Sequence, residues 1–365
     1  MHKVQLAYTW TDEPQGARAL HHPLLAMLAA LQESGSISAA ARQLELSYRH
    51  VWGELKRWEA KLGQPLVLWI KGQPAVLAPF GEKLLGAERR ALARLAPQIE
   101  SLRSELERAF ALAFDVGSGV ISMSASHDDA LPLLRDWLSE RHQLQLDIQF
   151  SGSVDALSAL NEGRCVLAGF HALTSAPSRS PTARTYRPLL KPNMHKLIGF
   201  VRRTQGLIVA RGNPLALQSL HDLTRSDVRF VNRPRGSGTR VVLEELLAGA
   251  QLLPSQISGF DRTELSQQAS AEAVASGSAD AAFGIHGAAV SLELDFVALA
   301  QETYFLVTSA HSLDQPAMQV LLQALQSPAW QQVLAAVPGC AAERSGEVLS
   351  LRHALPWWTC RKPKR

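Results

Sequence analysis

The sequence of 365 residues is poor in the features that mark secreted, membrane-spanning or zinc-binding proteins. Its three cysteines, Cys165, Cys340 and Cys360, lie far apart without the paired spacing of zinc ligands, which favours a reducing compartment. No run approaches the length of a membrane span, so no membrane partner is expected. The first residues also lack the basic and apolar regions of a secretory signal. These absences together predict a cytoplasmic protein.

Common catalytic signatures are also missing. The chain has no HExxH sequence, no paired-carboxylate pattern, no nucleophile elbow and no phosphate-binding loop with its lysine. We therefore expect no enzyme, no catalytic residue, no metal site and no cofactor. What is present is an ordinary balance of 46% hydrophobic and 19% charged residues, in a chain long enough for two or three folded domains.

Charge is unevenly distributed along the chain. Residues 1–112 carry 14 Lys/Arg against 11 Asp/Glu, residues 113–350 carry 18 against 22, and the last 15 residues carry 5 against 0. A mildly basic N-terminal part, which we call the head, followed by an acidic part, which we call the body, suits a DNA-binding domain joined to a sensing domain. The basic C-terminal tail, residues 346–365, fits a solvated chain end better than a set of additional phosphate contacts.

The most specific signal lies in residues 34–72. Ser36 and Ser38 are helix-capping residue types before a short amphipathic helix, and Ser47 can cap a second helix after a three-residue turn. Exposed basic and hydrogen-bonding groups near the start of that second helix are what major-groove reading requires. The residues expected to contact double-stranded DNA are Ser36, Ser38, Ser47, Tyr48, Arg49, His50, Trp52, Lys56, Arg57 and Lys71.

This segment resembles the winged helix-turn-helix of the molybdate-responsive ModE regulators and, more distantly, of LysR-type regulators. The residues that carry the resemblance are 35–41, 47–48, Trp52, and a strand–turn–strand at 65–79 followed by residues 80–84. The resemblance implies that Ser47 and Tyr48 open the recognition helix and that Lys71 lies at the tip of the wing. Residues 1–80 would then form the DNA-binding domain.

Residues 81–114 are expected to form a linker and dimerisation helix. Apolar residues repeat there at alternating spacings of three and four, although Pro97 predicts a kink or a break. Because helix-turn-helix proteins usually read two half-sites, a homodimer or homotetramer is expected. The alternative is a helix that packs only on its own head. The apolar positions are Leu92, Leu95, Ile99, Leu102, Leu106 and Ala109.

Residues 115–345 alternate short apolar strands with helices, the pattern of an α/β domain. Strands are expected at 120–123, 146–150, 166–170, 197–201, 207–209, 228–231, 281–285 and 304–308. Helices are expected at 130–138, 154–162, 215–223, 241–248, 271–276, about 315–325 and 328–336. The order is similar to the periplasmic-binding-protein-like fold, on residues 151–153, 168–171, 206–214, 232–240 and 273–281. That resemblance implies two lobes joined by crossing strands.

In such a fold the ligand lies at the carboxyl ends of strands, against helix N-termini. Loops rich in Ser, Thr and Gly offer hydroxyls and N–H groups to an anion, and nearby His and Arg could add charge. Residues 151–153 could equally be a turn, and His171, His286 and one of the two arginines could be structural. The ligand-binding candidates are Ser124, Ser126, His127, Ser151, Ser153, His171, Arg235, Ser237, Gly238, Thr239, Arg240 and His286.

Together these features predict a one-component transcriptional regulator that binds a DNA operator and senses a small anion. The resemblance of the head to ModE, and of the body to modules that accompany molybdenum-cofactor genes, favours molybdate or tungstate and a link to molybdenum-enzyme genes. The arginines would also suit formate, another small carboxylate or a larger phosphorylated ligand. The alternatives of a different class are an enzyme of molybdenum-cofactor handling and a transport binding protein.

Overall fold

The computed structural model describes residues 22–69, 74–113, 119–173 and 175–358. The chain forms two compact units, Met1–Ala93 and Arg94–Arg365. Lys71, expected at the tip of the wing, lies outside the described residues. Within the described parts, no single helix has the length and apolar character of a membrane span, and only the pair of helices at residues 23–43, bent by 119°, would pass that test together.

The first unit is a helix-turn-helix with a strand pair. Its helices are α1 (Pro23–Ser34), α2 (Ile37–Gln43) and α3 (Tyr48–Leu62), followed by the antiparallel strands β1 (Val67–Leu68) and β2 (Val76–Leu77). Gly35 and Gly63 end α1 and α3 in the left-handed conformation, where glycine carries no Cβ penalty. The buried stripe of α3 at Val51 and Leu55 packs on α1 and α2, so the order expected from sequence is confirmed.

Helix α4 (Pro79–Ala113) is 35 residues long and continues through Pro97, so of the kink or break expected there, the break is absent. Proline removes one N–H donor, but the turns on either side keep their own bonds. From Arg94 onward the helix belongs to the second unit. There Arg94 makes two hydrogen bonds to Glu264, of 2.6 and 2.7 Å, and Glu100 accepts one of 2.8 Å from Arg135. Ser101 Oγ accepts a hydrogen bond of 3.0 Å from the Phe150 N–H.

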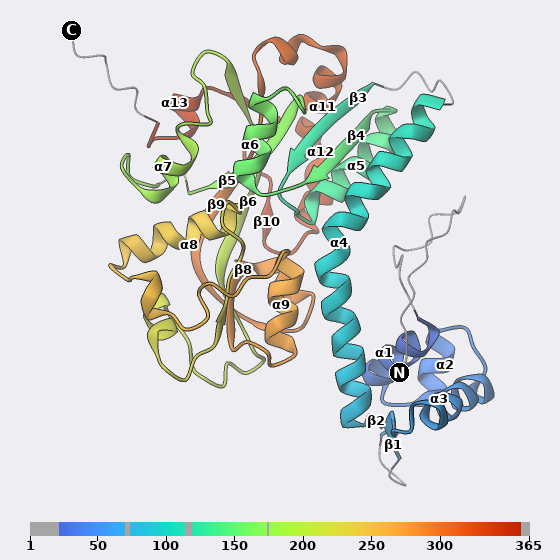
Figure 1. The fold of residues 1–365 in the computed structure, drawn as a ribbon. Coiled ribbons are helices and arrows are strands. Elements are labelled where there is room, and N and C mark those ends of the chain that lie inside the picture. The colour runs from blue at the N-terminus through green and yellow to red at the C-terminus, as the bar shows by residue number, and fades with distance from the viewer. Residues whose placement is uncertain (1–21, 70–73, 114–118, 174, 359–365) are drawn as a thin grey trace. The chain divides into compact units, whose positions relative to one another are not determined.

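The second unit is built on a nine-stranded sheet in the order β4-β3-β5-β9-β6-β8-β7, with β10 and β11 pairing on β6 (Figure 1). The two longest strands, β6 and β9, pair antiparallel with register shifts after Gly199 and Gln205. The strands expected separately at 197–201 and 207–209 are therefore one strand. The strands are β3 (Val120–Ala125), β4 (Gln145–Phe150), β5 (Leu167–Ala172), β6 (His195–Val209), β7 (Phe230–Val231), β8 (Ala281–Ile285), β9 (Asp295–Ser309), β10 (Cys340–Ala341) and β11 (Val348–Leu349).

Two lobes share β6 and β9. Lobe I contains β3, β4 and β5 with α5 (Ala130–His142), α6 (Ser153–Asn161), α11 (Pro316–Gln326) and α12 (Pro328–Ala335). Lobe II contains β7 and β8 with α8 (Gly238–Gly249), α9 (Gln267–Ala275) and α10 (His286–Val290). Helix α8 also packs on α7 (Pro181–Tyr186) and β5, so one apolar core runs from lobe I into lobe II. This confirms the two-lobed architecture with crossing strands.

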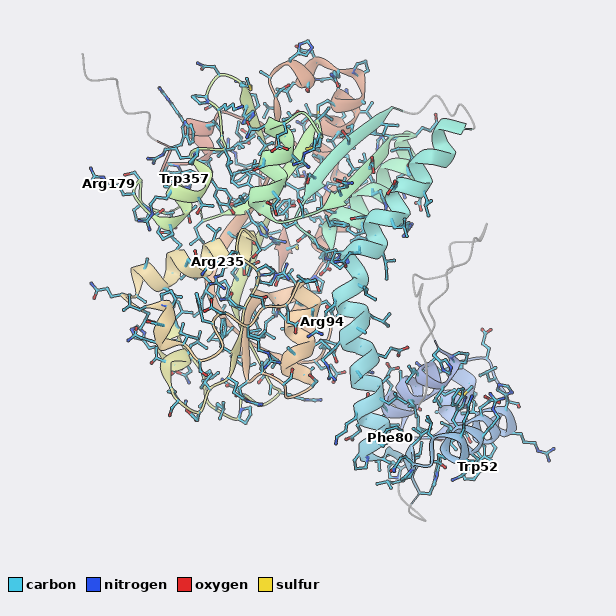
Figure 2. The ribbon with its side chains drawn as sticks, in the orientation of Figure 1. Trp52, Phe80, Arg94, Arg179, Arg235 and Trp357 are labelled. Atoms are coloured by element: carbon cyan, nitrogen blue, oxygen red, sulfur yellow. The ribbon has the colours of Figure 1, made fainter. Side chains whose placement is uncertain are left out.

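Two further expectations from sequence are wrong. The helix expected at 215–223 is a short 3₁₀ helix, Leu220–Thr224, because Asn213 and Ala216 adopt left-handed conformations and Ser219 with Asp222 forms a capping box. The tail expected from residue 346 is folded as far as Trp358, and residues 359–365 lie outside the described part. Strand β11 and helix α13 (Leu351–Ala354) precede Trp357, which is buried and donates its indole N–H to Leu173 O (Figure 2).

Candidate functional site

The recognition surface predicted from sequence is the start of α3. Ser47 is its N-cap and accepts a hydrogen bond from the His50 N–H, which fixes the first turn. Tyr48, Arg49 and His50 are exposed there, and no side-chain partner of Arg49 or His50 occurs among the described residues. Ser36 occupies the N-cap of α2 without a side-chain bond, and Ser38 is exposed inside that helix. The exposed groups lie where a helix N-terminus would meet base edges.

Aromatic rings support the same surface. Trp52 stacks on Tyr48 at 6.5 Å and meets Trp69 edge-on at 4.9 Å, with the Lys56 ammonium 5.0 Å above the Trp52 ring (Figure 2 labels Trp52). Lys56 also pairs with Glu59, and Arg57 pairs with Glu54 on the same helix. Two of the predicted DNA-contacting cations are thus engaged within α3, whereas Arg49 is not.

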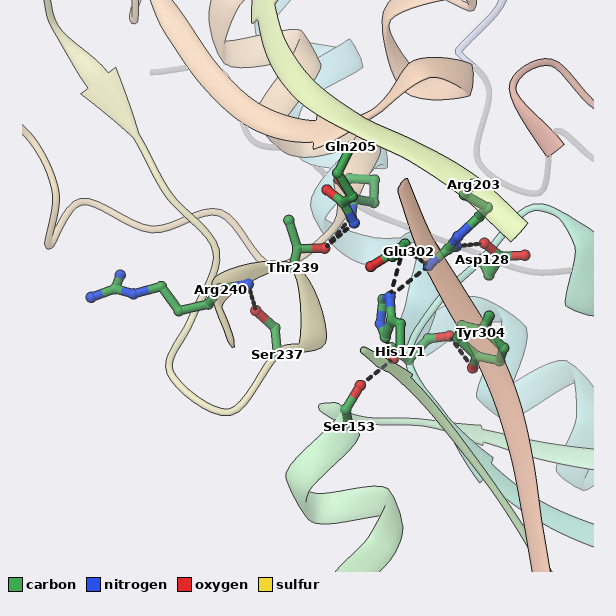
Figure 3. A network of polar contacts seen from close by, with 12 residues as sticks. Asp128, Ser153, His171, Arg203, Gln205, Ser237, Thr239, Arg240, Glu302 and Tyr304 are labelled. Atoms are coloured by element: carbon green, nitrogen blue, oxygen red, sulfur yellow. Dashed lines mark hydrogen bonds and ion pairs between the residues drawn. The ribbon is translucent and has the colours of Figure 1, made fainter. Parts of the chain in front are cut away.

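A second group of predicted residues meets at the junction of the two lobes, and three side chains form its centre (Figure 3). Ser126, after β3, lies with its Oγ 2.8 Å from His171 Nε2 and 3.1 Å from Ser153 Oγ. His171 is on β5, and Ser153 is the first residue of α6. Gly238, the first residue of α8, lies so close that an added methyl group would collide with the His171 ring and come within 2.7 Å of Ser153 Oγ.

Behind His171 lies a buried charge cluster, Asp128, Arg203 and Glu302, which the sequence analysis did not predict. Arg203 on β6 is the cross-strand neighbour of Glu302 on β9 and binds it at 2.5 Å, and it also pairs with Asp128. All three side chains are nearly inaccessible to solvent. Burial alone would raise the pKa of Glu302, but the charge of Arg203 outweighs it and lowers this pKa to about 2.

The charge cluster fixes the direction of the hydrogen bonds. His171 Nδ1 lies 2.5 Å from Arg203 Nη2 and 3.2 Å from Glu302 Oε1. The nearer neighbour is a guanidinium, which has donors only, so we assign Nδ1 as the acceptor of the Arg203 hydrogen bond. The proton of the neutral ring is then on Nε2 and is donated to Ser126 Oγ. Ser126, having accepted this bond, can donate its own proton to Ser153 Oγ at 3.1 Å or to a ligand.

Thr239, the second residue of α8 in lobe II, has a hydroxyl group that is oriented by hydrogen bonds, as that of Ser126 is. Its Oγ1 accepts hydrogen bonds from Gln267 Nε2 at 2.6 Å and from Gln205 Nε2 at 3.5 Å. Both acceptor positions of the hydroxyl are then filled, so Thr239 also has a proton to donate. We call Ser126, Ser153 and Thr239 the hydroxyl cradle.

The order Ser126–His171–Glu302 resembles the Ser–His–acid arrangement of hydrolases, but it cannot act as one. A general base must accept the serine proton at Nε2 while donating from Nδ1 to the acid. Here Arg203 is the nearer neighbour of Nδ1, at 2.5 Å against 3.2 Å for Glu302, and favours the opposite tautomer. The arrangement therefore orients a hydroxyl donor and does not activate a nucleophile.

The remaining predicted ligand residues lie apart from the cradle. Ser124 and Ser151 bond each other at 3.0 Å beside a cavity of about 270 Å³, and Ser237 caps α8 by accepting the Arg240 N–H. Arg235 is exposed, whereas Arg240 is buried and bonds Glu244 on its own helix.

Neither of the other two histidines touches the cradle in the described part of the chain. His127 packs on Phe150 and His286 on Phe296, at ring distances of 4.9 and 5.0 Å. Burial lowers the pKa of His127, against the opposing charges of Asp129 and Glu100.

Sequence reasoning missed Arg203, Gln205, Glu302 and Gln267. Arg203 and Gln205 are two residues apart on β6, so both point to the same face of the sheet. The polar residues at 202–205 interrupted the apolar pattern, so a loop was predicted between the strands expected at 197–201 and 207–209. Their alternation within one long strand was the available signal.

Two models of known protein families match this chain. A model of the PBP superfamily domain matches residues 135–326, more than half of the chain. A model of the bacterial regulatory helix-turn-helix of the LysR family matches residues 23–82. The chain belongs to the PBP superfamily and carries a LysR-family head. It is therefore a LysR-type DNA-binding transcriptional regulator and not an enzyme, so the molybdenum-cofactor enzyme considered from sequence is excluded.

Individual relatives of the regulator are more distant. It is 29% identical over 227 residues to the uncharacterized protein YvgK of Bacillus subtilis, covering 62% of this chain and 73% of YvgK. It is 38% identical over 86 residues to the molybdenum-pterin-binding protein MopB of Rhodobacter capsulatus, of which it spans only 32%, while the match covers 22% of this chain. The crystal structure of full-length BenM matches with a TM-score of 0.42 at 15% identity, covering 86% of this chain and 96% of BenM.

Proposed function

We propose that the regulator senses a small oxyanion, molybdate or tungstate, at the hydroxyl cradle, and controls genes for molybdenum enzymes. The observation that carries the proposal is the direction of the hydrogen bonds. Ser126 and Thr239 come from different lobes, and each has accepted N–H bonds and retains a proton to donate. An oxyanion has acceptors only, so it suits such a site.

The position of the cradle supports the same proposal. Ser153 and Gly238 are the first residues of α6 and α8, whose N-termini carry partial positive charge. Two arginines would favour a carboxylate. Arg240 is directed away from the cradle in Figure 3 and bonds Glu244, and Arg235 is exposed. The partial likeness to MopB, whose name records molybdenum-pterin binding, adds a weaker indication.

A small carboxylate such as formate is the second candidate, and one observation favours it. Arg203 carries one positive charge between the carboxylates of Asp128 and Glu302. These three groups carry a net negative charge, so a monovalent anion would experience less repulsion beside them than a divalent one.

Calorimetry with the full chain tests the ligand directly. Molybdate and tungstate should bind, formate should bind more weakly, and sulfate and phosphate serve as controls of the same shape. Removing one donor by Ser126→Ala or Thr239→Val should weaken molybdate binding by about 10-fold or more, since a hydrogen bond to a charged group contributes about 1.5–3 kcal/mol.

Matched variants separate a lost donor from lost structure. Thr239→Ser keeps the hydroxyl and should retain most of the affinity. Thr224→Val removes an exposed hydroxyl that bonds only the nearby His221 carbonyl in the structure, and should change nothing. Unaltered molybdate isotherms for both Ser126→Ala and Thr239→Val would contradict the assignment of the cradle.

We also propose that the regulator binds a palindromic operator as a homodimer or homotetramer formed through α4. Leu95 and Leu102 are seven residues apart on that helix and are 36% and 48% exposed. Such an apolar pair on one face suits a second copy of the helix. Ligand would act by binding two states of the assembly with different affinity.

The double variant Leu95→Glu/Leu102→Glu should therefore shift the mass measured by light scattering to that of a monomer. It places two charges at the apolar positions of the proposed interface. Gln98→Glu adds a charge without removing an apolar contact and should leave the mass unchanged. An unchanged mass in the double variant would argue against assembly through this face.

A further inference from the structure

A cavity of about 870 Å³ lies beside the loop that leads into α8, on the side of this loop away from the hydroxyl cradle. It is lined by α8 and by the loop at residues 254–262, with Val154 of α6 and Thr185 of α7 at its edge. Its volume falls in the range of pockets for organic ligands, about 300–1,000 Å³. The apolar part of the lining consists of Val154, Val241, Pro254, Ile257 and Phe260.

A buried arginine forms part of the lining. Arg240 is 3% exposed and its guanidinium lies 4.0 Å from the centre of the Phe260 ring. Nε bonds Glu244 at 2.8 Å, and Nη1 bonds the Phe260 carbonyl at 3.1 Å. Nη2 is held less tightly, with Asp261 at 3.9 Å as its ion-pair partner. Asp261 is 87% exposed, so that pair is weak and Nη2 can bond an incoming group.

Two more arginine side chains line the cavity. Arg235 is exposed, with no bonded side-chain partner in the described part of the chain, and Figure 2 labels its position. Arg262 is also exposed and donates one Nη1 bond, to the Ser278 carbonyl, which leaves its other donors available. The lining therefore combines an apolar wall with three guanidinium groups, against the two carboxylates of Glu244 and Asp261.

We propose that this cavity binds a small organic anion, with an apolar body against Phe260 and Val241 and a carboxylate or phosphate held by Arg235, Arg240 and Arg262. The site is separate from the hydroxyl cradle. Between them runs the 236–238 backbone, where the Gly236 carbonyl accepts the Val154 N–H at 3.1 Å. This site does not depend on the identity of the oxyanion.

The proposal also explains the composition of the RGSGTR segment, residues 235–240. Its arginines, Arg235 and Arg240, line the cavity, while Thr239 belongs to the cradle on the other side. One loop would thus contact two ligands. Because the loop is shared, an organic anion bound in the cavity would alter the position from which Thr239 donates its proton.

Calorimetry with benzoate and phenyl phosphate tests the site in the full chain, with benzamide as the uncharged control. Both anions should bind and benzamide should bind at least about 10-fold more weakly, because it lacks the charge. Comparison of the two anions shows whether carboxylate or phosphate is preferred. The double variant Arg235→Gln/Arg262→Gln should weaken both by about 10-fold or more, since each arginine donates a charge-assisted bond. Arg211→Gln, at an arginine that is 80% exposed elsewhere in lobe II, should have no effect.

A competition experiment keeps this proposal distinct from the oxyanion site. Phenyl phosphate should still bind when the protein is saturated with molybdate, although its affinity can shift through the shared loop. Complete loss of phenyl phosphate binding under those conditions would place both ligands at one site and overturn the proposal. Absence of binding by both anions, or equal affinities in wild type and the double variant, would overturn it as well.

Discussion

Replacing Arg203 with leucine is expected to lower the free energy of unfolding by about 3–5 kcal/mol, the largest stability effect we anticipate for a single side chain here. The substitution leaves Asp128 and Glu302 buried without their cation, and both are 1% exposed. It also removes the donor that holds His171 in the tautomer described above. Urea unfolding followed by circular dichroism measures the loss directly.

Two variants make this result specific. Arg203→Leu/Glu302→Gln removes one of the unpaired charges and should recover part of the stability. Arg211→Leu breaks an exposed pair with Glu293 and should change stability by less than about 0.5 kcal/mol. A wild-type urea midpoint for Arg203→Leu would mean that the cluster does not stabilise the domain.

The same measurement repeated across pH should show the contribution of Glu302. Its pKa falls from 4.5 to about 2 in the folded protein, so its stabilisation is fully present above pH 4.5. It is lost as the pH falls through 4.5 toward 2, because the folded state then has to take up a proton that the unfolded state already carries. A shift of this size corresponds to about 3 kcal/mol, and Glu302→Gln should flatten the acid limb by a comparable amount.

Arg49→Ala is expected to reduce operator affinity by about 10-fold to more than 100-fold. One bidentate arginine–base contact contributes about 1–3 kcal/mol, and a dimer would lose two of them. Arg49 is exposed on the first turn of α3 and has no side-chain partner in the described residues, so its removal should leave folding and molybdate binding intact. Fluorescence anisotropy with an operator duplex, selected beforehand by the wild-type protein from random DNA, measures the change.

Arg57→Ala is the matched control for this substitution. Arg57 is on the same helix but pairs with Glu54 at 2.5 Å, so its loss should weaken binding less and mainly reduce the salt dependence. If Arg49→Ala binds the selected operator as tightly as wild type does, the assignment of the recognition surface is wrong.

The head of the regulator was predictable because local patterns determine it. The capping serine Ser47, the buried stripe at Val51 and Leu55 and the strand pair all follow from spacings of a few residues. The order of strands and helices in the body was recoverable for the same reason. The length of β6 and β9 was not, since their polar residues find partners far away in the sequence, as Arg203 and Glu302 do across 99 positions. A single sequence contains no direct signal of that pairing.

The ligand residues show the same limit at finer scale. The RGSGTR segment was predicted to contribute to one anion site, with a structural role left open for one of its arginines, but its side chains leave the backbone in opposite directions. Arg240 turns toward Phe260, and Thr239 turns toward Gln205 and Gln267. Residue type predicted the loop as a binding element, and only the fold shows that Arg240 and Thr239 face different surroundings.

The contacts of α4 with the two lobes have a mechanical consequence. Arg94 is bonded to Glu264 in lobe II, and Glu100 is bonded to Arg135 in lobe I. The six helical steps from Arg94 to Glu100 span about 9 Å, so this rigid segment fixes the distance between its attachment point on lobe II and its attachment point on lobe I. A lobe movement that changes the span must break one of these ion pairs or bend the helix. Pro97 lies midway between the two attachment points, where the helix lacks one of its own hydrogen bonds and resists bending least.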